Sequence, residues 1–531
     1  MAKEKINLGD FQQLGRYVGF LCLTYEILII SQVSNLIYMI FGGAAAEVAS
    51  CGDDSTFKEM ANAKLKCAHL EEVQSATNCT PTLEGQFESA AYEFGYYCAG
   101  TKTMKNSISF QMIGIMFGAI VFGQLSDTFG RRKTLVFGTI GLIISGAAST
   151  FATGLISFTV ARFFVMFFTG GKHSVSYVFM MENLPMKHRM WIVTVITYSP
   201  NYIVFAGLAY ICGEWRLLSR VVAAITVIPL ILLMFIYESP RWLIQKGRFD
   251  EARKALVGMG KWDGTGSDER CQKIDEMLEQ EKARLHANED SSGHAKKYYT
   301  YHLFSTPALA SYTILFAYSL MITSIISYGL IFNMEKLSGS IFLNTILVGS
   351  LRYAINIVAA IVDIRCQKVG RRILHGIAMG FISASLGCVF VIFILGYQLT
   401  LQGFVRVTAL AAAAMCSEIY ILDAVSPSEL FPTPIRNIGI GFIQTWNRIG
   451  NILSPQIFVL SEYWPPLSYL VMFLISLAEV IGFECIVPET KGKQLPDSMP
   501  GDKRMSIDAE ANERTKILGN AEEMKEVKHD S

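Results

Sequence analysis

Apolar positions along this chain fall into twelve long runs separated by polar stretches. The runs cover residues 17–43, 107–125, 134–153, 156–180, 190–212, 217–237, 308–332, 341–364, 373–397, 402–424, 437–460 and 465–487. Their lengths are close to the roughly 20 residues that an α-helix needs to cross the hydrocarbon core of a bilayer. The pattern therefore predicts an all-α membrane protein with twelve transmembrane helices.

The polar stretches between the runs predict the domain organisation. A short N-terminal segment, 1–16, precedes six helices over 17–237, and a polar insert, 238–305, separates them from six more over 306–488. The insert carries charged residues at helical spacing, which favours short amphipathic helices. The tail over 489–531 is highly charged, and we expect it to be disordered.

Basic residues in the short connections predict the orientation of the chain. Those that should share one side hold Arg131, Arg132, Lys133, Lys187, Arg189, Lys368, Arg371 and Arg372, whereas the opposite side holds little beyond Arg216 and Lys336. By the positive-inside rule, both termini are expected to be cytoplasmic.

The polar stretch 44–106 is then an extracellular loop domain after the first helix. It contains Cys51, Cys67, Cys79 and Cys98, and the sequon that begins at Asn78. Disulfides form and glycans are attached outside the cell, so the four cysteines predict two bridges with three possible pairings. Asn78 is the predicted glycosylation site.

Composition excludes several classes of function. Hydrophobic residues make up 51% of the 531 residues, and the formal net charge is +1, which gives no reason to expect a nucleic-acid partner. The chain has no Walker A pattern, HExxH, CxxC pair or dinucleotide glycine fingerprint. We therefore expect no cofactor, no metal and no enzymatic activity, with membrane lipid and a small-molecule substrate as the partners.

Three sequence motifs recur in the same order in the two halves. "DTFGRRK" pairs with "QKVGRRI", with Gly130 and Gly370 lying 240 positions apart. "ENLPMKHR" pairs with "ELFPTPIR" at an offset of 247, and "ESPRW" has a weaker echo in "ETKGK" at 251. A nearly constant offset predicts two six-helix halves.

The charged residues of these motifs are candidates for gating. Asp127 and Arg131 are four residues apart at a predicted helix end, so they can pair with each other and with the neighbouring half, and such pairs can break and re-form. In the second half Gln367 occupies the aspartate position, so the C-terminal gate is expected either to be weaker or to use Asp363. The full predicted gating set is Asp127, Arg131, Arg132, Glu182, Arg189, Glu238, Arg241, Arg371, Arg372, Glu429 and Arg436.

Arg448 stands in the middle of an otherwise apolar run. An arginine at the centre of a membrane helix costs about 2.5–3.5 kcal/mol on insertion scales, so it predicts a functional site. A stripe of polar residues shares its helix face, namely Gln444, Asn447, Asn451 and Ser454. Lipid cannot satisfy these groups, so the stripe is expected to face a central cavity.

Other polar and aromatic residues in the runs extend this candidate substrate site. Arg352 and Lys172, which is next to His173, add positive charge, and Glu26, Glu418 and Asp423 add negative charge. Aromatic residues that could wall an apolar part of the solute are Tyr198, Tyr328, Tyr420 and Trp446. The cations could bind substrate, or they could pair with the three acids in a structural network, and sequence does not choose between these interpretations.

The motifs also carry a family resemblance. "GQLSDTFGRRK" matches the G-x-L-x-D-x-x-G-R-R-x signature of the major facilitator superfamily. With the large first loop, "ESPRWLIQKGRFDEA" and "ELFPTPIRNIGIG", the chain resembles the organic cation, organic anion and carnitine transporter family. The resemblance implies the major facilitator fold, a cavity between the halves, alternating access and a place in the plasma membrane.

The resemblance also bears on the charge of the substrate. At the position of Arg448, members of that family that carry organic cations have aspartate, and members that carry anions or carnitine-like zwitterions have arginine. The chain departs from the family at Arg352, where an acidic residue is usual, and at Asn356, near which many anion carriers have lysine. We expect a transporter of small carboxylate-bearing organic anions or zwitterions. The alternatives are an organic cation or amine carrier that uses Glu26, Glu418 or Asp423, and a solute sensor that does not transport.

Overall fold

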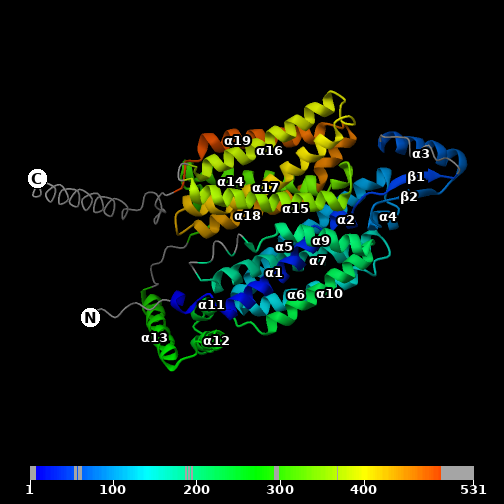
Figure 1. Ribbon diagram of the computed structural model, residues 1–531. Coiled ribbons are helices and arrows are strands. Elements are labelled where there is room, and N and C mark those ends of the chain that lie inside the picture. The colour runs from blue at the N-terminus through cyan, green and yellow to red at the C-terminus, as the bar shows by residue number, and fades with distance from the viewer. Residues whose placement is uncertain are drawn as a thin grey trace, which may run out of the picture.

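The computed structural model describes residues 8–52, 57, 63–185, 188, 192, 195–291, 298–366 and 369–491. Its long helices form two bundles that lie side by side (Figure 1). The N-terminal half contains α1 (Arg16–Leu36), α2 (Met39–Gly42), α5 (Thr101–Phe129), α6 (Arg131–Ser149), α7 (Leu155–Asn183), α9 (Ser199–Cys212) and α10 (Trp215–Met234). The C-terminal half contains α14 (Pro307–Ile331), α15 (Ile341–Arg365), α16 (Arg371–Ile394), α17 (Gln402–Leu430), α18 (Arg436–Leu453) and α19 (Leu467–Ile486).

Each of the twelve predicted runs overlaps one long helix. Nine helices in the described part of the chain are long and apolar enough to cross a membrane. The other three are α6, α9 and α18: α9 has 14 described residues, α6 begins with three basic residues, and α18 carries the polar stripe around Arg448. The start of the run that contains α9 lies partly outside the described residues.

Glycines bring α5 and α7 into close contact. A Cβ atom on Gly118 would lie 1.9 Å from the backbone oxygen of Phe167, and one on Gly170 would lie 2.4 Å from that of Ile115. Such distances are far below van der Waals contact, so only glycine fits at this crossing. The two helices therefore pack backbone against backbone.

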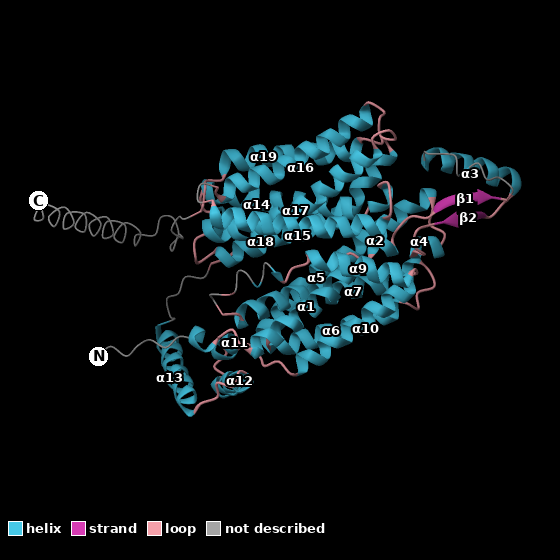
Figure 2. Cartoon of the chain, viewed as in Figure 1, coloured by secondary structure: helices cyan, strands magenta, loops and turns pink. Residues whose placement is uncertain are grey.

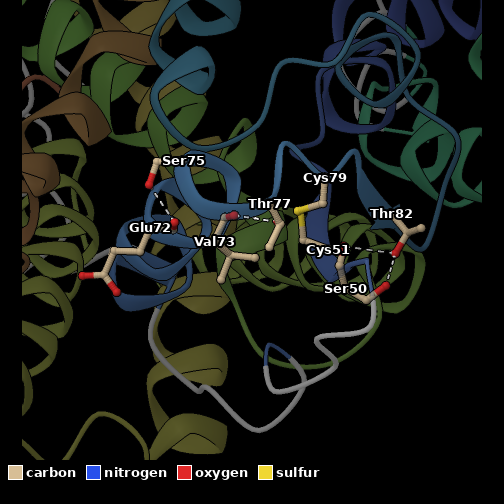
Figure 3. The surroundings of a disulfide bond; sticks show 8 residues. All are labelled: Ser50, Cys51, Glu72, Val73, Ser75, Thr77, Cys79 and Thr82. Atoms are coloured by element: carbon tan, nitrogen blue, oxygen red, sulfur yellow. Dashed lines mark hydrogen bonds between the residues drawn. A yellow bond between two sulfur atoms is a disulfide. The ribbon is translucent and has the colours of Figure 1, made fainter.

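The loop domain between α2 and α5 contains two short strands, which the sequence analysis did not predict (Figure 2). Strand β1 (Glu47–Cys51) pairs antiparallel with β2 (Pro81–Glu84), next to α3 (Ala63–Thr77) and α4 (Ala90–Glu93). The disulfides are Cys51–Cys79, shown in Figure 3, and Cys67–Cys98, and they select one of the three pairings left open. Ser50 and Thr82 join the two strands beside the first bridge.

The insert between the halves is helical, as the charge pattern predicts. It contains α11 (Pro240–Gln245), α12 (Phe249–Trp262) and α13 (Asp268–Ser291). These helices lie at the opposite end of the bundles from the loop domain (Figure 1). Asp263 accepts a hydrogen bond from the backbone N–H of Tyr17 at the start of α1 (2.9 Å), and Arg270 donates one to the backbone oxygen of Phe11 (3.0 Å). The insert is therefore attached to the N-terminal half.

We call the two ends of the bundles the loop-domain end and the insert end. The two halves are joined at the loop-domain end, where Lys105 Nζ of α5 lies 3.0 Å from Glu335 Oε1 and donates to the backbone oxygen of Phe332 (2.8 Å). Gln456 reaches across to Asn106 (3.0 Å) and Ser109 (2.9 Å). These contacts close the interface between the halves at that end.

Candidate functional site

At the insert end of the N-terminal half, Arg131 bridges two acids. Its Nη1 lies 2.5 Å from Asp127 Oδ1, and its Nη2 lies 3.2 Å from Glu182 Oε1. The side chain of Arg131 is only 9% exposed, whereas that of Asp127 is 70% exposed. We call Asp127, Arg131, Glu182 and Glu238 the N-half charge cluster.

Glu238 completes this cluster by capping a helix. Both of its carboxylate oxygens accept hydrogen bonds from the backbone N–H of Arg132, at 2.9 and 3.1 Å. The first N–H groups of a helix have no intrahelical partner and carry partial positive charge, which a carboxylate satisfies. Gly130, with φ of +110°, allows α5 to turn directly into α6 beside this carboxylate.

The C-terminal half repeats the arrangement. Arg371 Nη1 lies 2.6 Å from Asp363 Oδ1, and its Nε lies 3.8 Å from Glu429 Oε1. Glu489 accepts hydrogen bonds from the backbone N–H groups of Arg371 (2.8 Å) and Arg372 (3.3 Å) at the start of α16. We call Asp363, Arg371, Glu429 and Glu489 the C-half charge cluster. Even the weakest sequence match, "ESPRW" with "ETKGK", thus marks the same capping role.

The remaining predicted gating residues lie at the same end or outside the described residues. Arg132 donates to the backbone oxygens of Leu233 (2.9 Å) and Met234 (2.7 Å), at the end of α10. Arg436 donates to the backbone oxygen of Phe431 (3.2 Å), and Arg241 is part of α11. Arg189 and Gln367 lie outside the described residues.

Two members of this region were missed in the sequence. Glu484 of α19 accepts from Arg372 Nε at 2.9 Å. Lys491 Nζ lies 3.1 Å from Asp363 Oδ1 and donates to the backbone oxygens of Asp363, Cys366 and Val369. Glu484 lies outside the repeated motifs, and Lys491 lies in the weak match "ETKGK" at a position where "ESPRW" has Pro240, so the repeat did not indicate a role for either residue.

Arg448 lies on α18, close to residues of both halves, and is partly buried. It acts electrostatically on His173 of α7, on Tyr198 at the start of α9 and on Tyr328 of α14. Among the described residues no carboxylate lies within ion-pair distance of its guanidinium, and no side chain accepts a hydrogen bond from it. We call Arg448, His173, Tyr198 and Tyr328 the central cluster.

A hydrogen-bond network holds the N-half side of the central cluster. The hydroxyl of Tyr198 donates to Gln32 Oε1 (2.9 Å) and is hydrogen bonded to His173 Nδ1. Gln32 in turn donates to Ser176 Oγ (2.9 Å). These contacts link α1, α7 and the start of α9. They hold the side chain of Tyr198 in position near Arg448.

The predicted polar stripe on α18 faces α14 and α17. Ser324 donates to Asn447 Oδ1 (2.5 Å), Asn447 donates to Gln444 Oε1 (3.0 Å), and the Tyr420 hydroxyl lies 3.0 Å from Ser324 Oγ. Asn451 is buried, and its Oδ1 has no hydrogen-bond partner. The stripe is therefore largely satisfied within the C-terminal half, and Arg448 stands at its edge.

Three other residues that were predicted to bind substrate do not share the surroundings of Arg448; they are Arg352, Lys172 and Trp446. Arg352 places its guanidinium carbon 5.3 Å from the ring centroid of Tyr202, a cation–π contact between the halves. Lys172 is fully buried and donates to Ser31 Oγ (2.9 Å), which lies beside Thr226, so its amine points into the core of the N-terminal half. Trp446 packs against Phe442 and lies about 200° around the helix from Arg448. The structure does not bring Lys172 or Trp446 to Arg448.

The acids do not neutralise these cations. Glu26 accepts from Asn201 Nδ2 (3.0 Å), and Asp423 accepts from Ser319 Oγ (2.7 Å). Glu418 is buried and is influenced electrostatically by Asp363 and Arg371, toward the insert end. In the described part of the chain, none of the three acids forms an ion pair with Arg448, Arg352 or Lys172. The structural network that the sequence allowed is therefore not formed there.

A separate recess of about 690 Å³ lies at the loop-domain end. Its charged lining is mostly acidic, from Glu47, Glu84, Glu88 and Glu335, with one lysine, Lys66. None of its lining residues comes from α18, so it is distinct from the central cluster.

Comparison with solved structures identifies the fold. The crystal structure of a D-xylose-proton symporter matches 90% of this chain and 100% of its own, with a TM-score of 0.59 and 16% identity. The inward-open conformation of the xylose transporter of E. coli matches with a TM-score of 0.60 and 16% identity, over 90% of this chain and 98% of its own. The chain therefore has the major facilitator fold.

Curated relatives and a family model identify the class. An organic cation transporter protein of Drosophila melanogaster is 28% identical over 417 residues, which are 77% of this chain and 73% of the relative. Organic anion transporter 3 of Oryctolagus cuniculus is 28% identical over 439 residues, 81% of this chain and 77% of the relative. Residues 18–498 match the family model described as sugar (and other) transporter. The chain is thus a multi-pass membrane transporter and belongs to the sugar (and other) transporter family.

Proposed function

We propose that this transporter carries small carboxylate-bearing organic anions or zwitterions across the plasma membrane, with Arg448 supplying the counter-charge. The observation that carries the proposal is the environment of Arg448. It is partly buried between the halves and has no carboxylate within ion-pair distance among the described residues. A partly buried guanidinium without a carboxylate partner favours binding of an anion from solution.

The geometry of the central cluster suits a carboxylate attached to an apolar body. A guanidinium offers N–H donors in a planar fork that matches a carboxylate in bidentate fashion. The rings of Tyr198 and Tyr328 lie on opposite sides of the interface between the halves and supply apolar walls. Arg352, stacked on Tyr202, adds positive charge to the same interface.

A zwitterion would need an acid at its other end, and Glu26 is the best candidate. Its carboxylate is bound by the amide of Asn201 and is partly buried on α1, which also carries Gln32. Asp423 does not suit this role or that of a cation site, because its side chain is fully buried beside His375. A cation carrier would therefore depend on Glu26 or Glu418.

We assign the loop-domain end to the outside and the insert end to the cytoplasm. Disulfides in the loop domain, the exposed Asn78 as a glycan acceptor and the basic connections at the insert end support this orientation. The contacts between the halves at the loop-domain end then correspond to a carrier closed to the outside. Alternating access would break these contacts while the two charge clusters re-pair across the insert end.

Substitution of Arg448 tests the proposal. In cells that express the full chain, Arg448→Ala should reduce uptake of a radiolabelled aryl carboxylate by about tenfold to a hundredfold, because a hydrogen bond to a charged group contributes about 1.5–3 kcal/mol. Arg448→Lys should retain part of the activity, since it keeps the charge and loses the bidentate geometry. The matched control is Arg220→Ala, which removes an exposed guanidinium from α10.

Two further measurements separate the alternatives. Equal uptake of a labelled quaternary amine by wild type and Arg448→Ala, with no uptake of the carboxylate by either, would show a cation carrier. A sensor would show saturable binding of the solute and no flux into vesicles that contain the purified protein.

A further inference from the structure

A second group of titratable side chains is buried in the C-terminal half, away from Arg448. His375 of α16, Asp423 of α17 and Glu479 of α19 meet there, and their side chains are 0% exposed. We call these three residues the buried triad. Neither the proposed substrate site nor either charge cluster includes any of them.

The imidazole of His375 stands between the two carboxyl groups. Its Nε2 lies 3.4 Å from Asp423 Oδ1 and 3.5 Å from Glu479 Oε1. The ring is stacked on Phe483, with centroids 3.5 Å apart and an interplanar angle of 5°. This stacking fixes the plane of the imidazole and separates it from solvent.

Few hydrogen bonds stabilise negative charge in the triad. Ser319 of α14 donates to Asp423 Oδ2 (2.7 Å), but Asp423 Oδ1 and both carboxylate oxygens of Glu479 have no hydrogen-bond partner in the described structure. His375 Nδ1 also has none. A buried carboxylate without donors is strongly disfavoured as an anion, and two carboxylates that share a site disfavour each other's ionisation.

The net charge of the triad depends on how many protons its three side chains bind. With every group in its ionised form, one imidazolium and two carboxylates leave a net charge of −1. Neutrality is reached when one carboxyl group also binds a proton. Glu479 is the better holder, because Ser319 directs its short hydrogen bond to Asp423 Oδ2 (2.7 Å), whereas neither oxygen of Glu479 receives a hydrogen bond of good geometry.

Each helix of the triad also carries a charge at the insert end. His375 follows Arg371 by four residues on α16, Asp423 precedes Glu429 by six on α17, and Glu479 precedes Glu484 by five on α19. Arg371 pairs with Glu429, and Arg372 pairs with Glu484. A change of charge in the triad therefore acts about one to two helical turns from these two ion pairs, along the same three helices.

Two other ionisable side chains, those of Tyr318 and Glu484, interact electrostatically with the triad. Tyr318 of α14 acts electrostatically on Glu479, and its hydroxyl donates to the backbone oxygen of Ile475 (3.3 Å). Glu484 of α19 acts on both His375 and Glu479 and is itself bound by Arg372 of α16. Among the described residues, the triad included, no group of three or more His, Cys, Asp or Glu side chains is placed so that it could hold a metal ion.

We propose that the buried triad is a proton-binding site in the C-terminal half, with Glu479 as the carboxyl group that gains and loses the proton, and that its protonation controls the C-half charge cluster. A proton that enters the triad removes a net negative charge close to Arg371 and Arg372. The attraction that holds these guanidinium groups within their own half is then weaker, so opening and closing of the insert end depends on pH.

Proton binding is measured directly on the purified full chain by infrared difference spectroscopy against pH. Wild type should show the carbonyl band of a protonated carboxylic acid that disappears on alkaline titration and shifts in heavy water. Glu479→Gln, an isosteric change, should abolish this band. Glu484→Gln, which removes an acid from the same helix outside the triad, should retain it.

A second variant keeps the test valid if Glu479→Gln does not fold. His375→Gln removes the cation that both carboxylates share, so the midpoint of the band should move upward by about one pH unit, a tenfold change in proton affinity. Absence of the band in wild type would overturn the proposal. An unchanged band in Glu479→Gln, or an unchanged midpoint in His375→Gln, would overturn it too.

The consequence for transport is measured separately, with the labelled aryl carboxylate. Wild-type uptake should change with pH around the midpoint found by infrared spectroscopy, and Glu479→Gln should remove this dependence. A pH-independent uptake in wild type would reject control of the charge cluster by the triad. Because the infrared measurement needs no substrate, its failure is distinguishable from a failure of the proposed transport function.

Discussion

The insert ends of the two halves have the same arrangement of ion pairs and helix caps, but they differ in the side chains that are buried next to it. In each half an arginine bridges two acids, and a glutamate caps the start of the following helix. The repeat offsets of 240, 247 and 251 place Leu135, Ser176 and Ile228 where the C-terminal half has His375, Asp423 and Glu479. The buried triad therefore has no titratable counterpart in the N-terminal half. The two halves thus share the contacts that hold the helix ends, and the buried titratable groups belong to the C-terminal half alone among the described residues.

The connections that precede α6 and α16 also differ. In the N-terminal half a single residue, Gly130, separates α5 from α6, whereas α15 ends at Arg365 and α16 begins at Arg371. Lys491 fills this longer connection by binding three backbone oxygens. The offset of 251 places Pro240 at the corresponding position of the N-terminal half, and proline cannot do the same.

The largest effect is expected from removing the bridging arginines. Arg131→Ala and Arg371→Ala should each destabilise the protein by about 2–3 kcal/mol, because each leaves partly buried carboxylates unpaired. Uptake should fall by at least several-fold in both variants, because a destabilisation of this size lowers the abundance of the folded protein in cells. Thermal unfolding and uptake measure the two effects, and Arg220→Ala is the control. A large loss in only one variant would break the equivalence of the two clusters.

A smaller effect should distinguish the two connections. Lys491→Ala should destabilise the C-terminal half by about 1–2 kcal/mol, since it removes a charged donor from the carbonyl groups at the end of α15. Hydrogen exchange should increase at the start of α16 and remain unchanged at the start of α6. Lys491→Arg preserves the charge and should lose less. Equal exchange at both helix starts would contradict the difference between the connections.

The smallest effect concerns the insert, which is attached to the N-terminal half. The hydrogen bond from Arg253 lowers the pKa of Asp275, in a contact that joins α12 to α13 at 2.5 Å. Because the folded-state pKa lies below the unfolded value, the contact stabilises the insert at neutral pH, and this stabilisation is lost as the pH falls through the folded-state pKa. Both side chains are largely exposed, so the effect is slight.

Limited proteolysis of the insert across an acidic pH range measures this contact. Cleavage between α12 and α13 should increase on acidification in wild type. In Arg253→Ala it should already be increased at neutral pH and should depend less on pH. The same pH dependence in both proteins would show that another group is responsible.

Much of the fold could be predicted because apolar runs and repeated motifs can be recognised directly in a sequence. Twelve apolar runs correspond to the long helices, and the repeated motifs locate Glu238 and Glu489 as partners of equivalent helix starts. The pairing of Cys51 with Cys79 could not be predicted, because spacing does not determine how loop segments meet.

The candidate site was less predictable, because the direction of a side chain depends on helix rotation. Lys172 and His173 are adjacent in sequence, yet their side chains point in different directions. The amine of Lys172 points into the core of the N-terminal half, whereas the imidazole of His173 is hydrogen bonded to Tyr198. The buried triad brings together residues from three helices that are far apart in the sequence. Of its three residues, the sequence analysis considered only Asp423, either as a partner of the cavity cations or as an acid that binds an organic cation.

The glycine crossing of α5 and α7 affects how inactive variants of this transporter should be interpreted. Gly118 and Gly170 touch no solute and belong to neither charge cluster, but even a methyl group at either position would force the two backbones apart. The equivalent positions in the other half are Val358 and Ser417, which already carry side chains. A genetic screen would therefore recover loss-of-function alleles at these glycines that report on steric clearance alone and say nothing about selectivity.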